Sequence, residues 1–306
     1  MARGYEPEEF ISPREVSEEG EGKARLSSRK DEPRDQVREK LGLGAGSQPN
    51  PRAARSPELR KVYEIRGRNY RLRSSEIATM IELGKFRAVA QQDLTELAYG
   101  SDKGRMRPDV ENLFRQDLVQ MKSVPQEEKG SRHLLALTKA GHRFLTETRI
   151  AGKEQALYFG FAKPREAHHD ADLYRLYQKA ADKIERCGGR NLRVVLDYEL
   201  KKRVYHELAK LGSDRASAES KRTVAERHGL QLVRGKIPLP DVRIEYDTPD
   251  GERAGVDIEL ATSHYRGRHL AEKARAGFSI YAHASDVANL RRVLDQRELT
   301  AEILSL

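Results

Sequence analysis

The chain has 306 residues and a formal net charge of +9, which favours a polyanionic partner such as nucleic acid. Its single cysteine, Cys187, excludes an internal disulfide and a multi-cysteine zinc site. Residues 1–20 contain no apolar core of a secretory signal, and no apolar run approaches the roughly 18 residues that cross a bilayer. We therefore expect a soluble, cytoplasmic protein that does not contact a membrane.

The N-terminal segment, residues 1–60, is rich in Glu, Arg, Ser, Gly and Pro and has few apolar residues at any regular spacing. Such a segment cannot bury enough apolar surface to offset the loss of chain entropy on folding. The composition predicts a disordered tail and linker that carries both basic and acidic side chains.

A regular apolar pattern begins after residue 62. Ile77, Met80 and Ile81 recur at i, i+3 and i+4, and Ser74 or Ser75 is a suitable N-cap. The spacing predicts a first helix here.

Two more helices are expected before residue 122. Residues 90–99 fit a short helix that ends at Gly100. After a basic, glycine-rich link, a third helix opens with Pro108 in its first turn and Asp109 near its N-terminus. Its predicted inward residues are Val110, Leu113, Phe114, Leu118 and Met121. Its predicted outward residues are Asn112, Arg115 and Gln116.

A hairpin follows, because residues 121–124 and 132–137 are extended segments joined by turn-forming residues. Thr138 then caps a helix that contains the LTKAG run. Three helices, a hairpin and a helix, with LTKAG after the hairpin, resemble the winged helix-turn-helix superfamily over residues 68–150.

This resemblance implies double-stranded DNA as the partner, with the third helix in the major groove. Arg115 would read guanine, and Asn112 and Gln116 would read adenine. The expected phosphate contacts are Lys103, Arg105 and Arg107 just before the helix, and Lys129 and Arg132 on the wing. Glu127 and Glu128 at the wing tip would repel phosphate. A merely solvated face, or a module that mediates protein contacts, remains the alternative.

The second half, residues 165–306, begins with an amphipathic helix predicted over 167–187 and ended by Gly188. A strand is predicted over 192–200, and then a charged region with two helical pieces separated at Gly212. The adjacent His168 and His169 are expected to cap a helix or to face solvent.

Two later strands alternate apolar and polar residues around the turn TPDG. If Gly251 adopts the left-handed conformation, Thr248 pairs with Glu252. Counting back from this pair predicts the facing pairs Val242–Ile258, Ile244–Val256, Arg243–Asp257 and Asp241–Glu259.

Two facing carboxylates, Asp241 and Glu259, destabilise a sheet unless a positive charge lies between them. A divalent cation is one candidate, and hard oxygen ligands select Mg²⁺ or Mn²⁺. Alternatively Arg243 or Lys273 neutralises the pair, or a different turn shifts the register.

A helix that carries Lys273, a strand, a helix and a last strand complete the chain. Helix, three strands, helix and strand resemble the PD-(D/E)xK nuclease superfamily, with Pro240-Asp241 and Glu259-Leu260-Ala261 at the motif positions. Ala261 stands where that superfamily has a lysine, and Lys273 is the candidate substitute. The resemblance implies the catalytic residues Asp241, Glu259, Lys273 and, as an extra upstream acid, Glu199.

The two halves together resemble the replication-relaxation family of plasmid and mobile-element proteins, through LTKAG, His168-His169, Asp241, the strand ending at Thr262, and Lys273.

The predicted fold class is α+β: a disordered tail, an N-terminal winged helix-turn-helix and an α/β restriction-endonuclease-like domain. The resemblance implies DNA binding in replication, relaxation or transfer, with a nuclease-like domain that is either metal-dependent or degenerate. It leaves homodimers and contacts with replication or transfer proteins open. The alternatives are a non-catalytic regulator whose C-terminal domain dimerises or binds a partner, and a structural scaffold.

Overall fold

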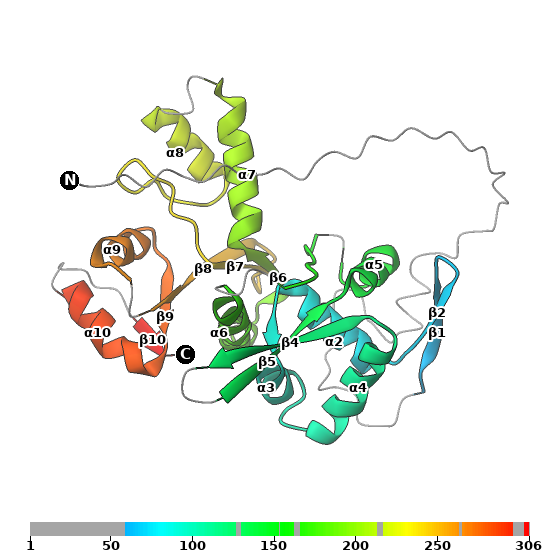
Figure 1. Cartoon of the computed structure of the whole chain (residues 1–306). Coiled ribbons are helices and arrows are strands. Elements are labelled where there is room, and N and C mark those ends of the chain that lie inside the picture. Colours follow the sequence, from blue (N-terminus) through cyan, green and yellow to red (C-terminus); the bar gives the residue numbers. More distant parts are fainter. Residues whose placement is uncertain are drawn as a thin grey trace, which may run out of the picture.

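The chain has a mixed α and β fold in the computed structural model (Figure 1). The structure describes residues 59–126, 130–152, 154–161, 166–212, 217–262, 265–295 and 303–305. The predicted tail lies almost entirely outside the described residues, as do Glu127, Glu128 and Lys129 of the predicted wing tip. Among the helices that are described, none is both long and apolar enough to span a membrane.

The first half places helices around a small antiparallel sheet with the strand order β3-β5-β4. An additional hairpin, β1–β2, precedes this unit and was not predicted. The elements are β1 (Lys61–Ile65), β2 (Arg68–Leu72), α2 (Ser74–Lys85), β3 (Val89–Ala90), α3 (Gln91–Asp93), the π-helical η1 (Leu94–Ala98), α4 (Lys103–Arg115), β4 (Val119–Gln126), β5 (Gly130–Leu137) and α5 (Lys139–Thr148).

The second half surrounds a five-stranded sheet with the order β10-β9-β8-β7-β6. Strands β6, β7 and β8 are antiparallel neighbours, whereas β8, β9 and β10 run parallel. The elements are α6 (Ala167–Arg186), β6 (Arg190–Leu196), α7 (Asp197–Lys210), α8 (Ala218–Arg227), β7 (Val242–Asp247), β8 (Arg253–Ala261), α9 (Gly267–Arg275), β9 (Ser279–Ala282), α10 (Ala284–Asp295) and β10 (Ile303–Ser305).

The predicted register of the β7–β8 hairpin is confirmed. The Thr248 backbone N–H donates to the Glu252 carbonyl at 2.8 Å, and Gly251 has φ +84°. Three of the predicted facing pairs are present, namely Val242–Ile258, Ile244–Val256 and Arg243–Asp257. The turn and the alternation together bury one face of both strands.

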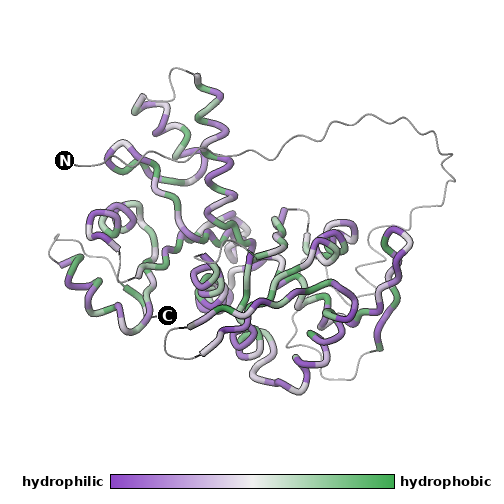
Figure 2. The backbone as a smooth tube through the Cα atoms, in the orientation of Figure 1, coloured by the Kyte–Doolittle hydropathy of each residue, from purple (hydrophilic) through white to green (hydrophobic). Residues whose placement is uncertain are grey.

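Helix α7 lies at the surface of the second half. Leu200 and Val204 are buried, while most other side chains of this helix are exposed. Hydrophilic and hydrophobic stretches therefore alternate along its backbone (Figure 2). Such amphipathicity binds one stripe of the helix to the core and leaves the rest solvated.

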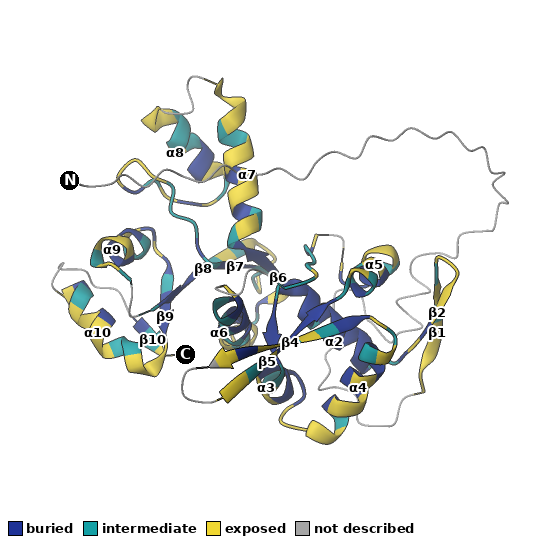
Figure 3. Cartoon of the chain, in the orientation of Figure 1, coloured by how far each residue is buried: buried dark blue, intermediate teal, exposed yellow. Residues whose placement is uncertain are grey.

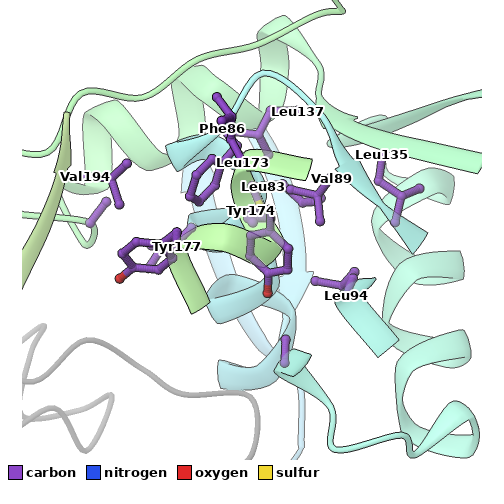
Figure 4. Packing of buried hydrophobic residues seen from close by; sticks show 14 of the residues in the cluster. Leu83, Phe86, Val89, Leu94, Leu135, Leu137, Leu173, Tyr174, Tyr177 and Val194 are labelled. Atoms are coloured by element: carbon purple, nitrogen blue, oxygen red, sulfur yellow. The ribbon is translucent and has the colours of Figure 1, made fainter. Parts of the chain in front are cut away.

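One hydrophobic core joins the two halves (Figure 4). Phe86, which follows α2, packs its ring against Tyr174 and Tyr177 of α6 at centroid distances of 5.4 and 5.5 Å. Burial of each such ring contributes about 2 kcal/mol. The contact fixes α6 against the N-terminal half.

Candidate functional site

Helix α4 begins one turn earlier than predicted. The Asp102 side chain accepts a hydrogen bond from the Arg105 backbone N–H at 3.0 Å, so the helix begins at Lys103. Pro108 lies inside the helix, not in its first turn. Lys103, Arg105 and Arg107 are therefore part of the helix and not of the link before it.

The two sides of α4 differ in character. Its exposed side presents Lys103, Arg107, Glu111 and Arg115 at steps of four residues. Arg107 and Glu111 form an exposed ion pair at 2.8 Å, which is worth at most about 0.5 kcal/mol and can be exchanged for another anion. The residues that anchor the opposite side are Met106, Val110 and Leu113.

Asn112 and Gln116 do not lie on this exposed side, so their predicted placement is wrong. Asn112 is 8% exposed, and its amide donates to the Arg71 carbonyl at 3.1 Å. Gln116 follows the helix; its side chain accepts from the Arg71 N–H at 2.7 Å and donates to the Arg71 carbonyl at 3.0 Å. Both amides are occupied in holding β2 against α4. Likewise Met121, expected on the inward stripe, is on β4 and half-exposed.

The β4–β5 hairpin, which is the predicted wing, is attached to α6. Arg132 forms ion pairs with Asp93 at 2.9 Å and with Asp172 at 2.8 Å. His168 of α6 hydrogen-bonds the Pro125 carbonyl at 2.9 Å. Arg132, predicted to contact phosphate, is thus engaged by two acids of the protein itself, and its side chain is only 17% exposed.

Three of the four predicted catalytic residues converge at one end of the hairpin β7–β8. Asp241 immediately precedes β7, and its carboxylate accepts the Leu260 N–H at 2.8 Å. Glu259 on β8 is fully buried. Lys273 of α9 places its ammonium 2.7 Å from Glu259 Oε1 and donates to the Leu239 carbonyl at 2.6 Å.

The charges at this carboxylate site are partly balanced. Lys273 is the cation beside Glu259, as one of the sequence alternatives held, and the Tyr265 hydroxyl donates to the same oxygen. Arg243 instead neutralises Asp257, through two hydrogen bonds of 2.6 and 2.7 Å. Burial and the nearby Asp241 charge raise the pKa of Glu259 to about 7, although Lys273 and Tyr265 oppose the shift.

The carboxylate site offers hard oxygen donors for Mg²⁺ or Mn²⁺. Glu259 Oε2 is buried and has no hydrogen-bond partner among the described residues. The Glu259 carboxylate is close enough to Asp241 to feel its charge. No cluster of three or more metal-ligating side chains occurs within the described part of the chain. The donor set fits an ion held by these two carboxylates, with water or phosphate as the remaining ligands.

Glu199 does not join this site, contrary to the prediction. Strand β6 ends at Leu196, and Glu199 lies in the first turn of α7, where Arg193 and Arg203 bind its carboxylate. The chain turns at Asp197, whose N–H donates to the Asp241 carbonyl at 3.0 Å. The strand predicted over 192–200 was therefore too long by about one helical turn.

His169, expected to cap a helix or to face solvent, instead approaches the site from α6. Its Nε2 lies 3.5 Å from the Asp241 carboxylate. Burial lowers the pKa of His169, but the hydrogen bond and charge of Asp241 outweigh burial and raise it. The adjacent pair His168-His169 was the only signal in the sequence, and it did not indicate which partner each ring meets.

Sequence reasoning missed Arg87. It extends from the first half toward three acids of the second, Glu166 at 3.4 Å, Asp197 at 3.7 Å and Asp170 at 4.0 Å. Asp170 is mostly buried, and burial raises its pKa to about 6 although Arg87 opposes the shift. Acidic side chains therefore continue from the carboxylate site toward the N-terminal half.

No family model matches the chain, and no curated protein matches it significantly.

Proposed function

We propose that the chain binds double-stranded DNA through residues 68–150, acting as a winged helix-turn-helix domain with α4 as its recognition helix. The order α2, β3, α3, α4, β4 and β5 around the β3-β5-β4 sheet agrees with this type of domain. The observation that carries the proposal is the exposed stripe of α4, which presents Lys103, Arg107 and Arg115 on one side of a helix anchored by its other side.

Each member of this stripe suits a different contact. The Lys103 side chain is exposed, has no hydrogen-bond or ion-pair partner in the described part of the chain, and can bind phosphate as a point charge. Arg107 can exchange the exposed Glu111 for phosphate at little cost. Among the described residues, the Arg115 side chain has only a long, 3.4 Å hydrogen bond to a carbonyl of its own helix, so its guanidinium can bind guanine in the major groove.

The experiment is duplex binding measured by fluorescence anisotropy with Arg115→Ala. Loss of a base contact weakens the preferred duplex by about 1–3 kcal/mol, or roughly 5- to 150-fold, and relaxes sequence preference. Arg292→Ala, an exposed arginine on α10, is the matched control. Equal affinities of Arg115→Ala, Arg292→Ala and the unmodified chain would rule out α4 as the recognition element.

A second function is favoured by the convergence of Asp241, Glu259 and Lys273. We propose that residues 165–306 form a PD-(D/E)xK-like domain in which the lysine comes from α9 and not from β8. Ala261, at the usual lysine position, is fully buried in an apolar cluster, so a lysine there would be costly. A bound Mg²⁺ or Mn²⁺ would polarise the phosphate and lower the pKa of a water. Asp241 and Glu259 would hold the ion, and Lys273 would stabilise negative charge.

Nicking of supercoiled plasmid with Mg²⁺ or Mn²⁺ tests this second function. Metal-dependent nicking that Glu259→Ala abolishes would assign a nuclease. Intact DNA binding without nicking would favour a degenerate domain and the alternative function, a regulator whose C-terminal domain dimerises or binds a partner. A role in plasmid replication, relaxation or transfer rests on the family resemblance alone, and binding of replication or transfer proteins is its direct test.

A further inference from the structure

The β1–β2 hairpin is a second basic element beside α4. It carries four basic side chains and one acidic one, and most of its surface is exposed (Figure 3). Its charged residues are Lys61, Glu64, Arg66, Arg68 and Arg71. The sequence analysis did not predict the hairpin, and the proposed DNA interface does not include it.

The hairpin has a fixed position because its inner side is packed. Tyr63 of β1 and Tyr70 of β2 face each other in the register and each meet the Phe144 ring edge-on at 5.6 Å. Phe144 belongs to α5 and is fully buried. A hairpin that is held by aromatic packing presents its outer side chains without a large loss of entropy on binding.

The hairpin also abuts the C-terminal end of α4. Gln116 holds the Arg71 backbone, and the Arg68 guanidinium donates to the Gln116 carbonyl at 2.8 Å. Gln116 directly follows Arg115. The hairpin arginines therefore lie beside the C-terminal end of α4, where its exposed stripe also ends.

Arg132 of the β4–β5 hairpin is not exposed in the same way. Arg132 is engaged by Asp93 and Asp172, and His168 fastens Pro125 to α6. The Arg71 side chain, in contrast, is exposed and has no hydrogen-bond or ion-pair partner within the described ranges. The β1–β2 side of α4 therefore offers an exposed arginine to a phosphate backbone.

We propose that the β1–β2 hairpin is a second contact with double-stranded DNA, in which Arg68 and Arg71 bind backbone phosphates beside the groove that α4 enters. This inference rests on the proposed function of α4. Phosphate contacts fix orientation and carry no base preference, so the hairpin contributes affinity that is equal for all sequences.

The test is the salt dependence of binding to a labelled duplex of about 20 base pairs, two helical turns. The slope of log K against log salt is negative, and each lost phosphate contact makes it shallower by about 0.9. We expect Arg71→Ala to make the slope shallower by about 1, and the double variant Arg68→Ala/Arg71→Ala by about 2, equally for different duplex sequences. Arg71→Ala leaves the backbone contacts of Arg71 intact, so it tests the proposal even if the double variant unfolds.

The outcomes separate this inference from the proposed function. If both hairpin variants bind like Arg292→Ala while Arg115→Ala binds more weakly, the hairpin contact is wrong and the role of α4 stands. If Arg115→Ala also binds like the control, the proposed function fails with it. Absence of duplex binding by the unmodified chain would overturn both.

Discussion

Lys273 and Glu259 form an ion pair of 2.7 Å between α9 and β8, in which the carboxylate is fully buried. A buried carboxylate of this kind is tolerated because a cation and the Tyr265 hydroxyl compensate for the water it has lost. The pair therefore ties α9 to the sheet at the candidate carboxylate site. The folded chain therefore depends on both partners for its stability.

Above pH 7, where Glu259 is ionised in the folded chain, replacement of Lys273 by Met should destabilise the chain by about 3–5 kcal/mol, because it leaves a buried carboxylate without its cation. Urea unfolding measures the loss. Glu259→Gln in the same chain should restore most of the stability, since the amide needs no counter-charge. Arg268→Ala on the same helix is the control: its ion pair with Glu272 is largely exposed at the arginine and should cost less than about 1 kcal/mol. If Lys273→Met lowers the free energy of unfolding as little as Arg268→Ala does, the structural role of Lys273 is wrong.

Glu259 should also make the free energy of unfolding of the chain fall as the pH rises toward neutrality. Burial and the Asp241 charge raise the pKa of Glu259 from 4.5 to about 7. Between these values the unfolded chain has released the proton while the folded chain keeps it, so the contribution of Glu259 to stability declines over this interval and is constant above it. Glu259→Gln should remove this decline. Unfolding free energies of both chains across pH 4–8 provide the measurement, and a constant difference between them would contradict the raised pKa.

Local patterns in the sequence predicted much of this site. The turn at Gly251 and the alternation of Val242 and Ile244 determine the β7–β8 register, since a shift of one residue would expose the whole apolar face. Glu199 was misplaced because its alternation continues past Leu196, while tertiary partners decide where the strand ends. Its partner Arg193 belongs to the same segment, yet nothing local indicates that the two side chains meet.

Contacts between distant segments explain the remaining errors. Arg132 pairs with Asp172 forty residues later, and Asn112 bonds the Arg71 carbonyl forty-one residues earlier. Composition and periodicity describe one segment at a time, so they classify both side chains as surface residues. The partners become visible only when these distant segments are packed together.

Arg132→Ala should therefore affect stability and not DNA binding. The substitution removes the guanidinium from one oxygen of Asp172 and one of Asp93, and both carboxylates are mostly buried. His283 still pairs with the other oxygen of Asp172 at 3.1 Å. Arg175 still pairs with Asp93, so we expect a loss of about 2–3 kcal/mol, below that of a fully orphaned pair. Thermal unfolding and duplex binding of the same preparation separate the effects. Weaker DNA binding at unchanged stability would indicate that Arg132 contacts DNA.

Asn112→Ala distinguishes the structural placement of α4 from the sequence-based one. The Arg71 carbonyl would lose one of its two side-chain donors and keep the Gln116 amide, so the cost should be about 1 kcal/mol of stability. Preference for adenine in a set of duplexes should be unchanged, because Asn112 faces β2 and not the exposed stripe. Competition binding with single-base variants of the preferred duplex measures that preference. A selective loss at an adenine, with stability intact, would show that Asn112 turns outward to the base and that the contact with Arg71 does not hold β2 in the complex.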